Sequence, residues 1–195
     1  MPRVIQGEAV LRTVRLRLEP LHVEHARELF PIYQDPRIFR FIPHDPPVSL
    51  EALEARCRVL EGRVSKDGRE VWLNWVARLE DTQRVLGRIE ATVREDATAG
   101  LAYELSPLFW GAGYATEACS RVLDLLFRAY ALDEVDALVD TRNESSIRLL
   151  ERLGFKRTGR RDRADFFKGG FSDEFAYRLL VTDSRPVRAD CADGA

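Results

Sequence analysis

The chain has 195 residues, of which 45% are hydrophobic and 32% charged, and its 30 basic and 32 acidic side chains leave a formal net charge of −2. This length suits a single domain that can bury a core without disulfides. No apolar run approaches the roughly 18 residues that would span a membrane, and the basic residues are scattered along the chain. We therefore expect neither a membrane nor a nucleic acid as partner.

The start of the chain has no long apolar segment followed by small residues, so we expect no secretory signal and a cytoplasmic location. The cysteines are far apart, and the histidines have no metal-ligand spacing with cysteines or carboxylates. We therefore expect no metal site and no disulfide framework. The residues concerned are Cys57, Cys119, Cys191, His22, His25 and His44.

In the first part of the chain, apolar and polar residues alternate over 14–19, which predicts a half-buried strand that opens the sheet and ends at Pro20. Apolar residues then recur at helical spacing over 26–33. Pro31 lacks an amide hydrogen and clashes with the preceding turn, so we expect it to divide this segment into two short helical pieces.

Ser49 is a good N-cap for the next helix, whose apolar stripe runs to Val64 and which we expect to end at 67–68. Three strands separated by polar turns follow, and the short turns favour an antiparallel meander. We expect these strands at 70–79, 84–93 and 100–105.

The second half of the chain returns to helical spacing over 115–131 and then to an apolar strand at 135–139. A strand, helix and strand in this order imply a crossover that joins parallel strands, here inside an otherwise antiparallel sheet. We therefore predict an α/β (α+β) fold with a mixed, mostly antiparallel twisted sheet flanked by helices.

Asn143 is the expected N-cap of a helix over 144–153, and Gly154 suits the left-handed residue that ends it. Two further strands are expected at 155–161 and 175–181. We expect one domain over 1–182 and a disordered tail over 183–195, because the tail is polar and lacks periodicity.

The segment between the strand at 100–105 and the helix that follows carries the strongest chemical signal. It contains Gly111, Ala112 and Gly113, which leave room for an anion close to the backbone, and no side chain there suits the N-cap of the helix. The free amide groups of a helix start attract phosphate. The alternative interpretation is a tight turn with no ligand.

Two common phosphate-binding motifs fit poorly. The Walker sequence G-x-x-x-x-G-K-S/T is absent from the chain. The dinucleotide fingerprint G-x-G-x-x-G lacks its third glycine, because Thr116 stands there, and the turn follows several antiparallel strands instead of opening a parallel sheet.

The stretch 110–118, WGAGYATEA, resembles the acetyl-CoA pyrophosphate loop of the GNAT N-acetyltransferases. Trp110 stands where that superfamily most often has Arg or Gln. This departure is frequent in one branch of the superfamily, which resembles the ribosomal-protein N-terminal acetyltransferases. Three more stretches resemble this branch and occur in the right order: TVRLRLEPL at 13–21, DPRIFRFIP at 35–43 and NESSIRLLERLGF at 143–155.

The resemblance implies a single-domain GNAT fold and an acetyl-CoA-dependent N-acetyltransferase. In this family an amine attacks the thioester directly, without an acetyl-enzyme, and the pantetheine arm of CoA lies between the strand before the loop and the next strand. Backbone donors near Leu105 are then available to a tetrahedral oxyanion. The implied CoA-binding residues are Leu105, Trp110, Gly111, Ala112, Gly113, Tyr114, Ala115 and Asn143.

Two residues are implied as catalytic groups. Ser146 matches the serine of the family's Asn-x-x-Ser and is our candidate proton donor to the leaving thiolate. Many members use a tyrosine acid near this position, for which this chain has no match. A pure capping role of Asn143 explains the same residues equally well. Glu104 is the candidate base, and the alternative for a single strand glutamate is to face solvent.

The amine acceptor is left open between a protein N-terminus and a small molecule, and the assembly between monomer and homodimer. Its pocket is expected near residues 39–47 and near Trp72 or Trp75, which face opposite sides of one strand. Asp45 is a candidate attractor for a cationic amine. The rival interpretations are a non-catalytic acyl-CoA-binding module and, less favoured, a dinucleotide-binding enzyme.

Overall fold

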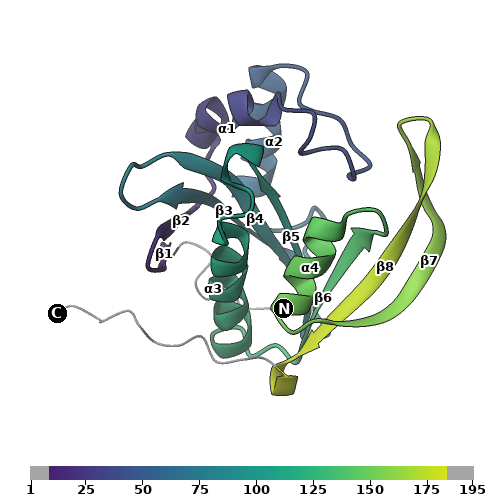
Figure 1. The fold of residues 1–195 in the computed structure, drawn as a ribbon. Coiled ribbons are helices and arrows are strands. Elements are labelled where there is room, and N and C mark those ends of the chain that lie inside the picture. Colours follow the sequence, from purple (N-terminus) through teal and green to yellow (C-terminus); the bar gives the residue numbers. More distant parts are fainter. Residues whose placement is uncertain (1–8, 184–195) are drawn as a thin grey trace.

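One eight-stranded sheet organises residues 9–183, the part of the chain that the computed structural model describes (Figure 1). The strand order is β1-β2-β3-β4-β5-β6-β8-β7. Every pairing is antiparallel except that of β5 with β6, which confirms the predicted mixed sheet. The strands are β1 (Leu11–Arg12), β2 (Leu16–Pro20), β3 (Val71–Leu79), β4 (Val85–Val93), β5 (Thr98–Leu105), β6 (Glu134–Asp140), β7 (Lys156–Phe167) and β8 (Gly170–Leu180).

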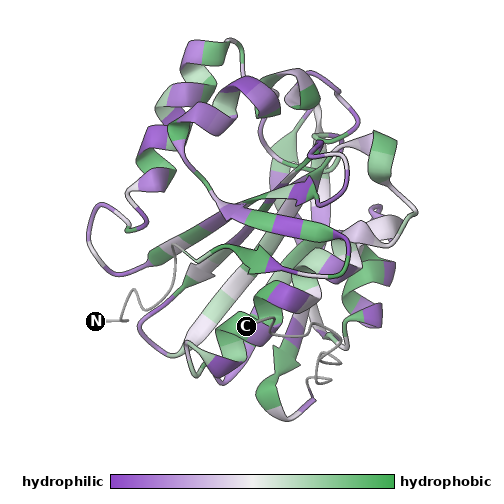
Figure 2. Ribbon diagram, turned by 90° about the vertical axis from the view of Figure 1, so that its left-hand side faces the viewer, coloured by the Kyte–Doolittle hydropathy of each residue, from purple (hydrophilic) through white to green (hydrophobic). Residues whose placement is uncertain are grey.

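Helices cover both faces of the sheet, as Figures 1 and 2 show. On β3, Trp72 and Val76 pack with α1 and α2, whereas Leu73 and Trp75 belong to the larger core that includes α3 and α4. None of the described helices is both long and apolar enough to cross a membrane. The helices are α1 (Ala26–Tyr33), α2 (Leu50–Glu61), α3 (Tyr114–Arg128) and α4 (Glu144–Arg152), with 3-10 turns at Val23–His25, Pro107–Phe109 and Val181–Asp183.

Two predicted helix boundaries are wrong. Pro31 lies inside α1 and does not divide it, because α1 ends two residues later and only the last turn loses a hydrogen bond. The 3-10 turn at Val23–His25 leads directly into this helix. The second helix, α2, ends at Glu61, where Gly62 is the C-cap and Arg63 has a φ of 57°. Val64 therefore leaves the helix and forms an isolated bridge with Val71.

The strands at the two ends of the chain also differ from the prediction. The strand that we expected to open the sheet, β2, is preceded by the two-residue β1. At the other end, β7 and β8 are longer than expected and form a hairpin that rises well beyond the rest of the sheet (Figure 1). Nearly all of β7 is exposed and more than half of its residues are charged, so no apolar alternation marks it. The expected tail lies outside the described residues except for Asp183, which ends the last 3-10 turn.

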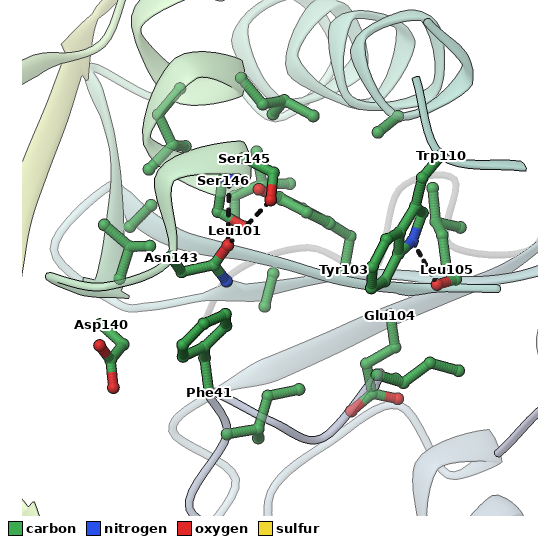
Figure 3. Close-up of a pocket in the computed structure, with 18 of the residues that line it drawn as sticks. Phe41, Leu101, Tyr103, Glu104, Leu105, Trp110, Asp140, Asn143, Ser145 and Ser146 are labelled. Atoms are coloured by element: carbon green, nitrogen blue, oxygen red, sulfur yellow. Dashed lines mark hydrogen bonds between the residues drawn. The ribbon is translucent and has the colours of Figure 1, made fainter. Parts of the chain in front are cut away.

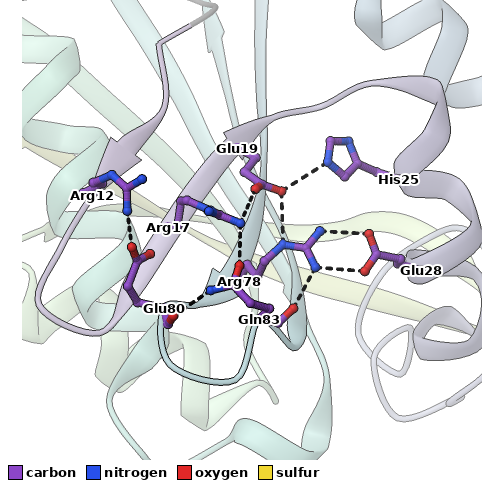
Figure 4. A network of polar contacts seen from close by, with 8 residues as sticks. All are labelled: Arg12, Arg17, Glu19, His25, Glu28, Arg78, Glu80 and Gln83. Carbon is purple, nitrogen blue, oxygen red and sulfur yellow. Dashed lines mark hydrogen bonds and ion pairs between the residues drawn. The ribbon is translucent and has the colours of Figure 1, made fainter.

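A polar network ties α1 to the sheet on the side away from α3 (Figure 4). Arg78 of β3 contacts Glu28 of α1 at 2.8 and 2.9 Å and Glu19 of β2 at 3.1 Å. The hydrogen bonds with Glu28 outweigh the opposing effect of burial and raise the pKa of Arg78. His25 also contacts Glu19, at 3.3 Å, and His22 contacts Glu61 at 2.7 Å, so both histidines have structural partners.

Candidate functional site

The two parallel strands separate halfway along their length. Their pairing starts at Thr98 opposite Glu134 and ends at Gly100 opposite Asp136, although β5 continues to Leu105 and β6 to Asp140. A cleft of about 670 Å³ lies over this split, and it is lined by both strand ends, the start of α3, α4 and the loop before α2. The backbone that the two strands leave unpaired therefore faces a cleft.

The start of α3 has no capping side chain, as predicted. Gly113 is its N-cap with a left-handed φ of 83°, a conformation that glycine adopts without strain. Ser49 and Asn143, by contrast, cap α2 and α4 through hydrogen bonds to the amides of Ala52 and Ser146, both at 3.2 Å. The first amides of α3 thus have no capping side chain, and three residues at this helix start line the cleft: Gly113, Tyr114 and Ala115.

Arg15 holds the loop that leads into α3. Its guanidinium contacts the Glu117 carboxylate at 2.6 Å, donates to the Ala112 carbonyl at 3.0 Å and lies 4.4 Å from the centre of the Tyr114 ring. Ala112 itself does not line the cleft, whereas Gly111 and Trp110 do. No local pattern predicts these contacts of Arg15, because they join residues about one hundred positions apart.

The carboxyl end of β5 presents a backbone amide to the split. Ser106 donates to the Leu86 carbonyl at 2.7 Å, so the neighbouring pair of Leu105 and Gly87 is of the non-hydrogen-bonded kind. The Leu105 amide consequently points away from β4 and toward the gap before β6. The Leu105 carbonyl accepts a hydrogen bond from Trp110 Nε1 at 2.9 Å, and the Trp110 side chain is half-exposed.

Asn143 and Ser146 meet Tyr103 on one side of the cleft (Figure 3). The Asn143 side chain accepts from the Ser146 amide at 3.2 Å and from the Ser145 hydroxyl at 3.3 Å. Tyr103 extends from β5 toward α4, where its hydroxyl is within hydrogen-bonding reach of Ser146. Burial raises the pKa of Tyr103, which therefore stays protonated. A tyrosine does lie near Ser146, contrary to expectation, because the fold brings it from another element.

Glu104 points to the opposite face of β5, as the alternation predicted, but it does not face solvent. Its side chain is 10% exposed and lies 3.3 Å from Arg88 and 3.3 Å from His44 Nε2. Burial on its own raises the pKa of Glu104; the charge of Arg88 and the hydrogen bond from His44 outweigh it and hold the pKa at about 2. Arg88 also contacts Glu90, at 2.9 Å. Glu104 is therefore an anion at every physiological pH.

The expected acceptor residues are only partly in place. Residues 37–38 and 40–44 line the cleft on the Glu104 side, with Phe41 drawn between Asp140 and Glu104 in Figure 3. Neither tryptophan of β3 lines it: Trp75 is fully buried in the core, and Trp72 donates to Glu70 at 3.0 Å. Asp45 also lies outside the lining, strongly exposed and 4.0 Å from Lys168. These three residues lie outside the site because the cleft is formed at the split between β5 and β6.

Neither Cys57 nor Cys119 lines the cleft. Burial raises the pKa of Cys57, and it raises the pKa of Cys119 to about 12, so both thiols stay protonated. Cys191 lies outside the described residues. Within residues 9–183, no group of three or more His, Cys, Asp or Glu side chains is placed to hold a metal ion.

Comparison with known proteins decides the family. A family model described as an acetyltransferase (GNAT) domain matches residues 15–156. The chain belongs to the GNAT family. This GNAT enzyme is 27% identical to an uncharacterised N-acetyltransferase of Bacillus subtilis (strain 168), YoaA, over 77% of this chain and 84% of the relative. GNAT enzymes transfer an acetyl group from acetyl-CoA to an amine, which confirms the enzyme class that the sequence predicted.

Solved structures agree on the fold. The ribosomal-protein-S5-alanine acetyltransferase of Vibrio fischeri superposes with a TM-score of 0.77 at 18% identity, over 91% of this chain and all of that one. Spermidine N-acetyltransferase of Vibrio cholerae, solved with CoA and spermine, has a TM-score of 0.75 at 20% identity, over 88% and 98% of the two chains. The GNAT fold predicted from the sequence is confirmed.

Proposed function

We propose that this GNAT enzyme acetylates a primary amine, on a protein N-terminus or a small molecule, by direct attack within a ternary complex of enzyme, acetyl-CoA and amine. The observation that carries the proposal is the split between β5 and β6. It opens one cleft with uncapped helix amides at one end and a buried carboxylate, Glu104, at the other. Two substrates of opposite charge can therefore meet at the strand ends.

The residues present fit acetyl-CoA, which would supply the activated acetyl group as a thioester. The amides of residues 111–115 would hold the pyrophosphate at the start of α3, where the helix dipole favours negative charge. Asn143, on the other side of the gap, would contact the pantetheine arm, and Leu105 would offer its amide to the oxyanion. Trp110 and Tyr114 would line the entrance to the CoA-binding part of the cleft.

On the acceptor side, Glu104 would act as the base in the removal of the amine proton. On the CoA side, Ser146 would donate a proton to the departing sulfur. The Tyr103 hydroxyl beside Ser146 supports this assignment, because a second protonated hydroxyl can replace the proton that Ser146 gives up. Both acceptor types named for the structural neighbours, an alanine of ribosomal protein S5 and spermidine, are candidates for this chain.

The proposal is tested by measuring release of the CoA thiol in the presence of amines of different classes. Suitable acceptors are an unblocked alanine-initiated peptide, spermidine and free lysine, with mass spectrometry of the product. We expect thiol release that depends on the amine. Tight CoA binding without release would favour the non-catalytic acyl-CoA-binding module, and competition between CoA and NAD would favour a dinucleotide enzyme.

We expect Trp110→Arg to retain CoA binding within about threefold. Trp110 would act by packing and by its hydrogen bond to the Leu105 carbonyl, and a guanidinium can supply both a donor and an apolar stem. Calorimetric titration with CoA checks this. A loss of affinity beyond tenfold would mean that the indole itself recognises the ligand.

Ser146→Ala should lower the acetylation rate by about 10² or more with little change in melting temperature, because its side chain caps nothing. The matched variant is Asn143→Ala, which removes the N-cap of α4 and should cost about 1 kcal/mol of stability. Tyr103→Phe should lower the rate less than Ser146→Ala. An unaltered rate in Ser146→Ala would return this serine to a structural role.

A further inference from the structure

His44 and Glu104 form a pair on the acceptor side of the cleft that the sequence did not suggest. His44 Nε2 lies 3.3 Å from Glu104 Oε1, and His44 lines the cleft. The two residues differ sharply in access to solvent: the His44 side chain is 59% exposed and that of Glu104 is 10% exposed. One member of the pair is thus open to an incoming substrate and to water, and the other is fixed behind it.

The surrounding structure holds both members in place. The Phe39 ring contacts the His44 ring edge-on, with centroids 5.5 Å apart. Lys168, from the turn of the β7–β8 hairpin, donates to the carbonyls of Phe39 and Ile42 at 2.6 and 2.9 Å and so fastens the loop that carries His44. Glu104 is fixed by Arg88, which is itself only 11% exposed.

We propose that His44 is the group that takes the proton of the acceptor amine, and that Glu104 is a positioning residue that fixes the His44 ring. This inference rests on the proposed function and refines the role given there to Glu104. The arrangement follows a general rule for activated bases, in which the base is oriented by a third group through its second nitrogen. Because Nε2 faces Glu104, Nδ1 is the nitrogen left for the substrate.

Proton affinities favour this division of roles. An alkylammonium titrates near 10, and transfer of its proton to a carboxylate with a pKa of about 2 is strongly uphill. Imidazoles as a class titrate between pH 5 and 8 and carry out general-base catalysis more often than any other side chain. Glu104 would then stabilise the imidazolium that forms, as a permanent anion.

The step balances without any further reactant. The ammonium gives one proton to His44, and the neutral amine nitrogen forms a bond to the thioester carbon. The carbon–sulfur bond breaks with its electron pair on sulfur, which ends as a thiol after taking up the second nitrogen proton by way of Ser146. His44 releases its proton to water through its exposed edge. The products are the amide, CoA thiol and one proton.

Charged groups on every neighbouring element enter the pH behaviour of His44. Glu104 faces it from β5, and Arg88 and Glu90 of β4 lie behind Glu104. Tyr33 of α1 is buried, and its pKa is raised by burial and by the charge of Glu104, so it stays neutral. Asp45 and Lys168 lie beside the loop, 4.0 Å apart. Glu104 is therefore the anion in contact with the His44 ring, and the Glu104→Gln change removes it.

The test uses the full chain with acetyl-CoA and two probe acceptors, spermidine and an unblocked alanine-initiated peptide. For the parent enzyme, kcat/KM should rise with pH through the titration of an imidazole, because the base must be neutral. His44→Gln should lower kcat/KM for spermidine by about 100-fold at pH 7, with the deficit shrinking toward pH 9 as free amine accumulates. The deficit should be smaller for the peptide, whose amine titrates near 8.

His22→Gln is the matched control, because it removes a histidine paired with a glutamate outside the cleft. It should leave the pH profile unchanged. Glu104→Gln should keep CoA affinity but lower kcat for spermidine, and the double variant with His44→Gln should be no slower than the worse single variant.

The outcomes separate the two levels of the proposal. Absence of thiol release by the parent enzyme with every amine would overturn the proposed function, and the role of His44 with it. Parent activity together with an unchanged pH profile in His44→Gln would overturn only the role of His44. A double variant much slower than the worse single variant would overturn the pairing.

Discussion

Gly113→Glu is expected to weaken CoA binding by at least about 100-fold, or roughly 2.7 kcal/mol. The new side chain would place a carboxylate at the uncapped start of α3, where the pyrophosphate is proposed to bind. A Cβ at Gly113 would lie 3.5 Å from Arg15 Nη2, so the longer side chain would also press on the residue that holds the loop. Calorimetry with CoA measures the loss, and circular dichroism checks that the variant is folded.

The matched control is Gly68→Glu. Gly68 has a similar left-handed φ of 74°, no heavy atom lies within 4 Å of a Cβ built there, and it lies outside the cleft. The same backbone strain and charge should therefore leave CoA affinity unchanged. Gly113→Ala separates strain from charge, and we expect it to bind CoA more tightly than Gly113→Glu. Unchanged affinity in a folded Gly113→Glu would rule out the assigned loop.

Arg88→Met is expected to destabilise the protein by about 3–5 kcal/mol at pH 7, because it leaves the buried Glu104 carboxylate without its cation. Glu90, which is less buried, loses the same partner. Urea unfolding measures the loss of stability. Adding Glu104→Gln should recover part of the lost stability. The free energy of unfolding of the double variant should therefore be about 1–3 kcal/mol higher than the two single losses added together predict. Strict additivity would show that the two charges do not interact.

The same carboxylate predicts the direction of a pH effect. The folded-state pKa of Glu104, about 2, lies below the ordinary value of 4.5. The ionised Glu104 therefore stabilises the folded protein above pH 4.5, and this stabilisation is lost as the pH falls toward 2. At about 1.36 kcal/mol per pKa unit, the loss amounts to roughly 3 kcal/mol. The stability difference between the parent and Glu104→Gln should shrink by this amount from pH 5 to pH 2. In Arg88→Met, burial would raise the pKa of Glu104 and remove the effect.

Several features of this GNAT enzyme could be predicted from the sequence because they depend on local patterns. Period-two alternation located β2, the polar turns between strands located the antiparallel strands β3 to β5, and the change to helical period located α3. The capping residues Ser49 and Asn143 and the left-handed Gly154 were confirmed, since each is determined by a few neighbouring residues. The uncapped start of α3 was visible for the same reason.

The site itself was decided by tertiary structure, because its groups come from segments that the chain brings together only on folding. Tyr103 lies near Ser146 through the packing of β5 beside α4, and Arg15 reaches the loop before α3 from the start of the chain. His44 showed no spacing with a carboxylate in the sequence, yet it lies 3.3 Å from Glu104.

Charge was the other property that local pattern left open. Alternation placed Glu104 on the face opposite Tyr103, but only the position of Arg88, sixteen residues away and directly across the β4–β5 pairing, decided that the carboxylate is buried and ionised. The split between β5 and β6 is likewise a matter of register, since pairing stops at Gly100 although both strands continue. Sequence periodicity determines which face a side chain takes; the partner that it meets there is determined by long-range pairing.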